Sequence, residues 1–452
     1  MKFTHILFAL AALSLPVVLH AQPVVSNVTF IQQPDGAGST EIVVTYDLST
    51  PDGPSTTTLL YSLDAAPFTP ALNVSGDVGP GLTTGTLIID WAVANDLPNI
   101  QSNNLVVRVV AEDGVPELLE FVSVPAGTFT MGRTMSADDT LHGSSIELPN
   151  HEVTLDDYDI GKFEVTNEEF ATVMNWALAN GYLADNTSGS AYGGSGNVYL
   201  MAQDVTSTRQ LLFDTVTGSS HSQIEWTGSA FVPRTRNSKS MENHPVVRVT
   251  WFGAVAFCNF LSEMEGKPLA YNLTTWDLVD KDPEISGIQF VAGYRLPTES
   301  EWERAAAWDG SKHWTYSFVS DTLTGKNRAN YREFNYINVN PVGLTSDPRT
   351  SPVGWFNGVN VSPNGSITTI NSPSPVGAYD MTGNVIEWCH DWYGPFDSLA
   401  KSNPTGPASG TDRILRGGGW NRDVRVCRTA TRGDVSPGWR SFDLGFRVAA
   451  TR

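Results

Sequence analysis

The chain has 452 residues, which is enough for two or three domains. Its 48 acidic and 28 basic residues give a formal net charge of -20. This charge argues against nucleic acid and anionic membrane as partners, because both require a clustered positive surface. Three cysteines, Cys258, Cys389 and Cys427, are too few and too far apart to form a disulfide framework.

Residues 1–21 are predicted to be a secretory signal peptide. Lys2 supplies the positive start, the stretch from Ile6 to Leu19 is apolar, and Ala21 offers a small residue at the cleavage point. The alternative is a retained membrane anchor, but the apolar run is shorter than the ~20 residues of a membrane span. We therefore expect a secreted, periplasmic or cell-surface protein with no membrane span after removal of the signal.

Residues 22–112 are predicted to form an all-β module. Short runs alternate apolar with polar residues, are rich in β-branched and aromatic side chains, and are bounded by turn-forming residues. The predicted strands are residues 24–31, 41–46, 57–62, 85–91 and 104–110. This pattern favours a β-sandwich of immunoglobulin or fibronectin type with a structural role. Residues 113–120 follow as a linker.

Residues 121–452 are predicted to be a second domain, rich in glycine, tryptophan and loops. Three helices are expected in it, each preceded by a threonine that can cap its first turn. They begin after Thr166, Thr250 and Thr298, and Glu169 and Glu301 complete a capping box in the first and third. Residues 184–242, with long polar runs, are predicted to be a surface insertion.

Five segments of this second domain occur in an order that is specific to one family. They read FVSVPAGTFTMG from 121, GYRLPTESEWERAAA from 293, GNVIEWCHDWYG from 383, RILRGGGW from 413 and LGFRVAATR from 444. Together they resemble the formylglycine-generating enzyme family, also called sulfatase-modifying factors. The resemblance implies an α+β domain of low regular secondary structure, related to C-type lectins. The expected fold class of the whole chain is mainly β with α+β.

The resemblance also defines where the chemistry of the family would lie. In catalytic members, two cysteines after a Gly-Gly-Ser-Trp-like turn bind copper(I) and engage a substrate cysteine. Counting forward from Gly417, the first of these positions is Arg422 and the second is Cys427. Counting back from Leu444 gives a different register, in which Cys427 matches neither catalytic cysteine.

Cys427 is therefore either a small core residue or a single reactive thiol. The alternation of Val424, Val426, Thr429 and Thr431 predicts a strand around it. Cys258 and Cys389 are predicted to be packing residues.

A calcium site is the second implication of the resemblance. The family ligands carry over to Asp380, the backbone carbonyls of Gly383 and Val385, and Glu387. Carboxylate and carbonyl oxygens close together in sequence suit this hard cation. The alternative is a tight turn capped by an acidic residue.

A second calcium site is expected further upstream. It would use the side chain of Asn330 and the carbonyl of Tyr331, with Asp347 as a further ligand. Both calcium sites are expected to be structural.

Aromatic and basic residues gather in the same signatures. Trp420 and Trp439 are candidates for a binding cleft, with Trp388 and Trp392 nearby in sequence, and the alternative is that all four fill the core. The arginines of the closing region are expected to form internal salt bridges; they are Arg422, Arg425, Arg428, Arg432, Arg440 and Arg447. Arg422 differs because it lies where a substrate would enter, which makes it a candidate contact for an anionic ligand.

The sequence thus favours an exported binding or accessory protein, stabilised by calcium and lacking a complete copper-thiolate pair. Its expected partner is an exported protein or small ligand, and a sulfatase is one candidate. The alternative function is an active formylglycine-generating oxidase that converts a sulfatase cysteine or serine to formylglycine.

Overall fold

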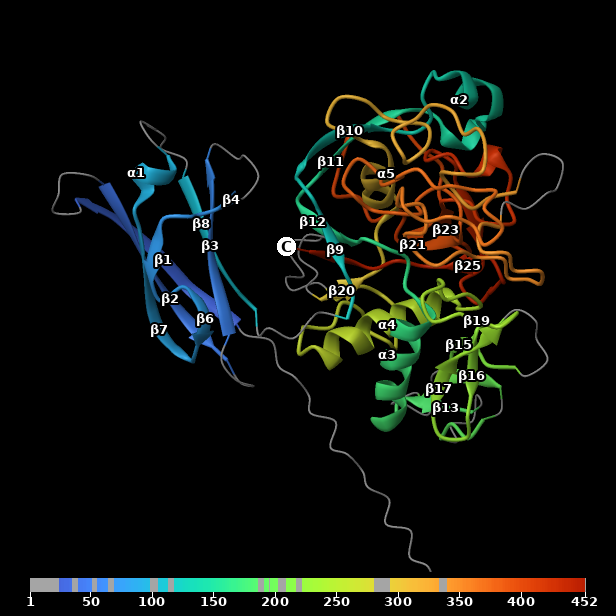
Figure 1. Ribbon diagram of the computed structural model, residues 1–452, viewed down its shortest axis with the longest axis horizontal. Helices are drawn as coiled ribbons and strands as arrows, with labels where there is room; N and C mark the ends of the chain where they lie inside the picture. Colours follow the sequence, from blue (N-terminus) through green and yellow to red (C-terminus); the bar gives the residue numbers. More distant parts are fainter. Residues whose placement is uncertain are drawn as a thin grey trace, which may run out of the picture.

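The computed structural model describes residues 24–34, 40–50, 55–63, 69–97, 105–112, 118–185, 191–194, 196–201, 209–216, 222–279, 293–332 and 340–451. The predicted signal peptide lies outside these residues, as does most of the predicted linker. The structure is mixed α/β and rich in strands, with an N-terminal set of antiparallel sheets before the second domain (Figure 1). No helix within the described ranges is both long and apolar enough to cross a membrane.

Two antiparallel sheets make up the N-terminal part. The first has the order β1 (Val24–Pro34), β2 (Thr40–Ser49), β7 (Gly85–Trp91) and β5 (Val74–Gly76). The second has the order β4 (Thr69–Pro70), β3 (Ser55–Leu63) and β6 (Gly79–Leu82), with β8 (Leu105–Glu112) also paired to β3. A short helix, α1 (Val93–Asp96), follows β7. The five predicted strands are confirmed as β1, β2, β3, β7 and β8.

These two sheets share one hydrophobic core, and alternation of side chains explains why. Every second residue of β2 is buried, including Tyr46, and these residues meet Trp91 of β7, Leu59 of β3 and Val109 of β8. The Trp91 Nε1 group donates a hydrogen bond to Asp96 at 2.7 Å, which satisfies the one polar atom of the buried indole. The immunoglobulin or fibronectin type of this module remains a prediction.

Four α-helices and two 3₁₀-helices lie in the described part of the second domain. They are α2 (Ala137–His142), η1 (Ser145–Glu147), α3 (Asn167–Ala179), α4 (Trp251–Met264), α5 (Glu299–Ala307) and η3 (Val424–Val426). Thr166, Thr250 and Thr298 cap α3, α4 and α5 through their side chains, and the capping boxes of α3 and α5 are complete. The three predicted helix starts are confirmed.

In three sheets of the second domain, strands that are far apart in sequence are hydrogen-bonded to one another. One has the order β20 (Tyr294–Arg295), β26 (Ala449–Thr451), β12 (Tyr158–Gly161) and β9 (Phe121–Val124). Another has the order β10 (Gly127–Met131), β11 (His151–Leu155) and β22 (Lys401–Ser402). The third has the order β24 (Gly433–Val435), β23 (Arg413–Arg416), β21 (Ile386–Trp392) and β25 (Leu444–Gly445).

The stretch 184–242, expected at the surface, instead contributes to the core. Its strands are β13 (Leu183–Ala184), β14 (Asn197–Leu200), β15 (Leu211–Asp214), β16 (Ile224–Trp226), β17 (Phe231–Pro233), β18 (Thr235–Arg236) and β19 (Lys239–Ser240). Phe213 of β15 and Phe231 of β17 are buried and contact Phe170 or each other through their rings. The sequence pattern of this stretch is dominated by the polar loops between its strands. The short apolar segments that face α3 and α4 were therefore not recognised as core.

The arginines of the closing region form internal ion pairs, as the sequence predicts. Seven pairs join Arg422 to Asp443, Arg425 to Asp423, Arg428 to Asp139 and Glu147, Arg432 to Glu299, Arg440 to Asp214, and Arg447 to Glu387. Several of these acids come from helices or loops far away in sequence. The pairs therefore fix the end of the chain to the first half of the domain.

The Arg447–Glu387 pair is fully buried and has nearly complete hydrogen bonding. Arg447 Nε and Nη2 donate to the two Glu387 oxygens at 2.7 and 2.8 Å. Its other donors reach the carbonyls of Gly161 and Tyr379, both at 2.9 Å. Trp302 of α5 adds a hydrogen bond to Glu387 at 2.7 Å. One bidentate pair thus connects β12, α5, β21 and the segment between β25 and β26 that carries Arg447.

Replacing Arg447 by methionine is expected to lower the free energy of unfolding by about 3–5 kcal/mol, because Glu387 would stay buried without its counter-charge. Urea denaturation of the mature protein measures the change. The matched control is Lys162→Met, which breaks the exposed Lys162–Glu120 pair and should change the free energy by at most about 1 kcal/mol. Similar losses in both variants would contradict this assignment.

Candidate functional site

The turn expected to carry the family chemistry borders a small cavity. This cavity has a volume of about 200 Å³, and its lining includes Ile386, Leu415, Gly418, Arg422 and Arg432. Gly417 and Gly418 adopt φ angles of 89° and 70°, which L side chains rarely adopt. A Cβ atom on Gly418 would lie 2.6 Å from Cys427 Sγ, so the turn requires glycine there.

Arg422 contributes one positive charge to this cavity, whose lining also includes Arg416, Arg432 and Asp434. The Arg422 side chain is 46% exposed, and Nη2 lies 3.0 Å from Asp443 Oδ2. Asp443 is itself buried and accepts a hydrogen bond from Ser441. The guanidinium therefore has one end fixed by an ion pair, and its remaining surface can contact an anionic group.

Cys427 lies in the interior, next to this cavity but without access to it. The predicted strand around it is wrong: Val424–Val426 form the 3₁₀-helix η3, and Cys427 is its C-cap residue. The Asp423 side chain accepts a hydrogen bond from the Arg425 backbone N–H, which favours a tight turn over an extended strand. Burial raises the pKa of the Cys427 thiol to about 12, so the thiolate is disfavoured at neutral pH.

These features favour the core interpretation of Cys427 over the reactive-thiol one. Cys427 packs in a cluster with Tyr316 and Phe318. Cys258 and Cys389 are also buried, and burial raises the pKa of each thiol. All three cysteines therefore occupy packing positions.

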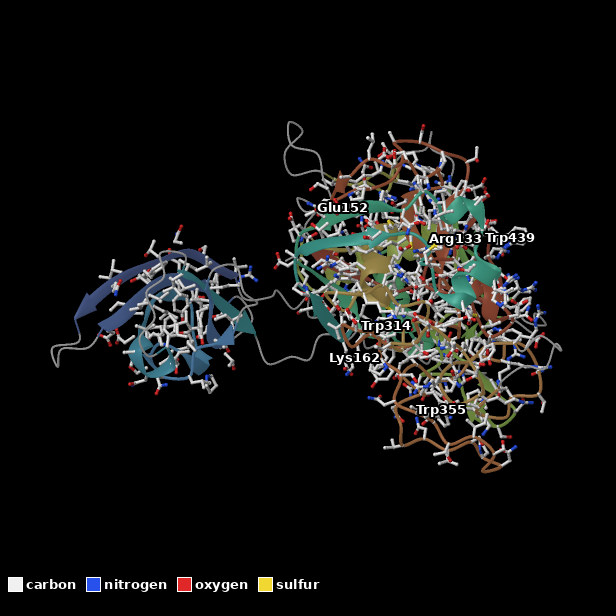
Figure 2. The ribbon with its side chains drawn as sticks, turned by 90° about the horizontal axis from the view of Figure 1, so that it is seen from above. Arg133, Glu152, Lys162, Trp314, Trp355 and Trp439 are labelled. Atoms are coloured by element: carbon white, nitrogen blue, oxygen red, sulfur yellow. The ribbon has the colours of Figure 1, made fainter. Side chains whose placement is uncertain are left out.

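The two tryptophans proposed for a binding cleft have opposite environments. Trp420 is 1% exposed and donates to the Phe442 carbonyl at 3.4 Å, so it is a core residue. Trp439 is 58% exposed, and its side chain lies at the periphery of the second domain (Figure 2). Trp388 is buried and donates to the Val249 carbonyl at 3.1 Å, and Trp392 is only partly buried. The expected cleft lined by Trp420 and Trp439 is therefore not formed as predicted.

The predicted calcium segment is a tight turn before β21. Asp380 and Asn384 have positive φ angles of 60° and 59°, and the Gly383 φ is 91°. A Cβ atom on Gly383 would lie 2.4 Å from the Asn330 carbonyl oxygen, so the two predicted calcium segments are in direct contact. Asp380 Oδ2 accepts a hydrogen bond from the Gly354 backbone N–H at 2.6 Å.

Glu164 is a member of this group that the sequence did not reveal. Its oxygens accept hydrogen bonds from the Val385 N–H at 3.0 Å and from the Asn384 side chain at 2.7 Å. Burial, together with Asp380 and Glu387, raises its pKa well above the usual range. It follows β12 and is far from Asn384 in sequence, so no local spacing indicates the contact.

Asp380, Glu387 and Glu164 share one nearby guanidinium, that of Arg447. Burial raises the pKa of Asp380 to about 6. When all four groups are ionised, the cluster carries an excess of two negative charges. Asp380 Oδ1 accepts no hydrogen bond from any described residue. A divalent cation would both neutralise the excess negative charge and bind this oxygen.

The predicted calcium ligands are two side chains and two backbone carbonyls, rather than a cluster of metal-binding side chains. No three His, Cys, Asp or Glu side chains converge as metal ligands in the part of the chain that the structure describes. The predicted set needs only two side chains, because two backbone carbonyls complete it. Glu387 already accepts hydrogen bonds from Arg447 and Trp302, which makes Asp380 the more available ligand.

The second predicted set contains one buried oxygen without a hydrogen-bond partner among the described residues. Asn330 Oδ1 is buried and has no hydrogen-bond partner among the described residues, while its amide nitrogen donates to the Arg349 carbonyl at 2.9 Å. Tyr331 follows it in the same buried stretch. Asp347 instead forms an ion pair with Arg349 at 3.2 Å and is partly exposed.

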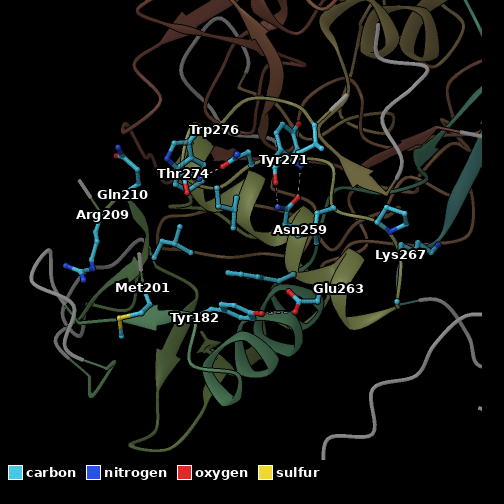
Figure 3. A pocket seen from close by; sticks show the side chains of 18 residues that line it. Tyr182, Met201, Arg209, Gln210, Asn259, Glu263, Lys267, Tyr271, Thr274 and Trp276 are labelled. Atoms are coloured by element: carbon cyan, nitrogen blue, oxygen red, sulfur yellow. Dashed lines mark hydrogen bonds between the residues drawn. The ribbon is translucent and has the colours of Figure 1, made fainter. Parts of the chain in front are cut away.

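A larger cavity of about 860 Å³ lies beside α4 and the loop after it. Its lining includes Tyr182, whose hydroxyl donates to Glu263 at 2.7 Å and whose ring stacks on Phe260 (Figure 3). Asn259 and Tyr271 exchange two hydrogen bonds at its inner side. We assign this cavity no role.

Comparisons with known proteins agree with the resemblance that the order of the signatures indicates. Residues 106–452 match the family described as "Sulfatase-modifying factor enzyme 1-like domain". The chain therefore belongs to the sulfatase-modifying factor family. The match begins within β8, a strand that pairs in the N-terminal sheets.

Individual relatives carry different names. The chain is 29% identical to the formylglycine-generating enzyme of Mus musculus over 344 residues, covering 74% of this chain and 75% of that protein. It is 30% identical to the chaperone protein LppX of Paenibacillus barcinonensis over 236 residues, covering 47% of this chain and 71% of that protein. Among solved structures, variable protein 1 of Treponema denticola is 26% identical with a TM-score of 0.43, covering 74% of this chain and 95% of that chain.

Replacing His390 by glutamine is expected to improve acid tolerance relative to the wild type. His390 is buried between Trp251 and Tyr271, and this burial lowers its pKa to about 3. Below the unfolded pKa of about 6.5, the unfolded chain binds a proton that the folded chain does not, so acidification favours unfolding.

Between pH 7 and pH 5, the unfolding free energy of the wild type should fall by about 2 kcal/mol more than that of His390→Gln. Urea denaturation at the two pH values measures it. A difference that does not change with pH would contradict the lowered pKa.

Proposed function

We propose that this protein is an exported, non-oxidase member of its family that binds a ligand or partner through the cavity at Arg422. The observation that carries the proposal is the pair of residues at the expected thiol positions. Arg422 is an ion-paired guanidinium, and Cys427 is a buried thiol with a raised pKa. In this proposal the N-terminal sheets form an immunoglobulin- or fibronectin-like spacer, and the second domain has the C-type-lectin-related fold.

Copper(I) does not fit the residues present at this site. A copper-thiolate site of the family kind needs two accessible sulfur ligands. Cys427 Sγ lies 3.9 Å from the Arg422 carbonyl, beneath the turn, and Arg422 brings a positive charge rather than a sulfur. A cation at this position would also be repelled by the guanidinium.

An acidic ligand or acidic surface of a partner fits the cavity better. The half-exposed guanidinium of Arg422 offers donors in a fixed orientation, because Asp443 holds one end of it. The relative named a chaperone supports an accessory role, in which the bound partner is another exported protein. A sulfatase is the candidate partner suggested by the family.

A peptide assay separates this proposal from the oxidase alternative. Purified mature protein is incubated with copper(I), oxygen and a Cys-x-Pro-x-Arg peptide, and the products are analysed by mass spectrometry. We expect no aldehyde, under conditions in which an active formylglycine-generating enzyme converts the same peptide. Aldehyde that forms with the wild type and disappears in Cys427→Ala would refute the non-oxidase proposal.

Calcium is the cation that we propose for the turn before β21. Asp380, the carbonyls of Gly383 and Val385, and Glu387 would hold it, and its charge would balance the carboxylate excess that includes Glu164. The unpartnered Asn330 Oδ1 in the adjoining segment supports a second ion. Both ions would stabilise the irregular loops that position the Arg422 cavity.

Calcium is expected to raise the Tm of the wild type, and Asp380→Ala is expected to abolish this rise. Thermal melting with calcium and with chelator measures both. Glu152→Ala, which removes an exposed carboxylate from β11, is the matched control and should keep the full calcium response. Glu387→Ala is less informative because it also breaks the Arg447 ion pair. An equal calcium response in wild type and Asp380→Ala would remove this site.

A further inference from the structure

A second cavity lies at the N-terminal end of α5, and it adjoins the one at Arg422 because Arg432 lines both. Its volume is about 310 Å³, within the range typical of small-ligand sites. The lining comes from five regions: β10 and β11 with Met131 and His151, the first turn of α5 with Glu299, the end of β21 with Asp391, the segment 394–407, and Arg432 before β24.

Most charges that line this cavity are already compensated. Arg432 donates two hydrogen bonds to Glu299, at 2.6 and 2.7 Å. Lys401 pairs with Asp397 at 2.7 Å. Asp391 has no ion-pair partner among the described residues, so it is the one lining carboxylate without a counter-charge there.

Asp391 has a free acceptor atom although it is only 4% exposed. Its Oδ2 atom accepts a hydrogen bond from the Glu299 backbone N–H at 2.8 Å. Its Oδ1 atom accepts none from any residue that the structure describes. A buried carboxylate with an unused oxygen and no cation is unfavourable unless a ligand or a proton neutralises it.

The neighbouring basic group does not reach this oxygen. Arg413 is held between the rings of Trp251 and Trp392, at 3.7 and 3.5 Å from their centroids. It donates to the His390 carbonyl at 2.5 Å. The other charges that act on Asp391 are the negative charges of Glu299 and Glu301. The field at Asp391 is therefore unfavourable for a second anion.

His151 offers a second acceptor in the same cavity. It is 5% exposed, and its Nδ1 lies 3.2 Å from the Pro149 carbonyl. Because a carbonyl can only accept, this contact places the proton of the neutral ring on Nδ1 and leaves Nε2 as an acceptor. Nε2 has no hydrogen-bond partner within the described ranges.

We propose that this cavity binds the ammonium or guanidinium group of a small organic cation, with Asp391 Oδ1 as its charge partner and His151 Nε2 as a second acceptor. These two acceptors lie on largely buried side chains and have no donor among the described residues, so they call for a ligand that is rich in N–H groups. The Arg413 guanidinium covers one face of Trp392, and Arg432 lies 3.8 Å from the Phe396 centroid. Ring stacking of a neutral sugar is therefore a poorer match than a cation.

Proton competition gives the site a characteristic pH dependence. Burial and the charge of Glu299 raise the pKa of Asp391 to about 8. A bound cation would displace this proton, so the affinity should strengthen as pH rises from 6 to 8, by about tenfold per pH unit at most. Above pH 8 it should level off.

Isothermal titration of the mature protein with propylammonium and propylguanidinium tests the site, with propanol as the neutral probe. We expect saturable binding of at least one cation and none of propanol. Asp391→Asn should weaken it about tenfold or more, because the amide keeps the acceptor for Glu299 N–H but loses the charge. Asp397→Asn, which removes a lining carboxylate that is already paired, is the matched control and should bind within about twofold of the wild type.

The proposal is overturned if neither cation binds the wild type, if propanol binds as tightly, or if Asp391→Asn binds equally well. Should Asp391→Asn fail to fold, as judged by thermal melting, the wild-type pH series decides. An affinity that does not change between pH 6 and pH 8 would then refute the assignment to Asp391.

Discussion

The ion pair between Arg447 and Glu387 is the constraint on which the rest of the second domain depends. It joins the segment between β25 and β26 to β21, and through the carbonyls of Gly161 and Tyr379 it reaches β12 and the turn that carries Asp380. Because both partners are buried, removal of either one would leave the other as an unpaired charge in the interior of the domain. A domain with short strands and long loops obtains from such pairs the fixed geometry that larger sheets obtain from backbone ladders.

The same logic explains why the candidate sites are electrostatic. Glu164, Asp380 and Glu387 share one guanidinium, and Asp391 forms no ion pair among the described residues although Arg413 lies nearby. Negative charge therefore exceeds positive charge at two places in the fold. At Arg422 the balance is reversed, because half of the guanidinium is free of Asp443. The proposed ligands are therefore cations at the first two places and an anion at the third.

Local signals in the sequence predicted much of this structure. The capping threonines located α3, α4 and α5, and the alternating runs located the main N-terminal strands, because both features depend on neighbouring residues. Contacts set by tertiary structure were missed. Glu164 is far in sequence from the turn that it binds. The Cys427 segment forms η3, capped by Asp423, rather than the predicted strand. Trp420 is buried and Trp439 is exposed, although both lie in the closing region of the chain.

The close contact between Gly418 and Cys427 has a consequence for attempts to restore oxidase chemistry. The sulfur is buried against the glycine turn and is not part of the cavity lining, and Cys427 is the C-cap residue of the tight η3 turn. Substituting Arg422 by cysteine would supply one thiol at the cavity and leave the other facing the interior. Gain of oxidase function would thus require a different backbone conformation between the glycine turn and η3. A single substitution would not be sufficient.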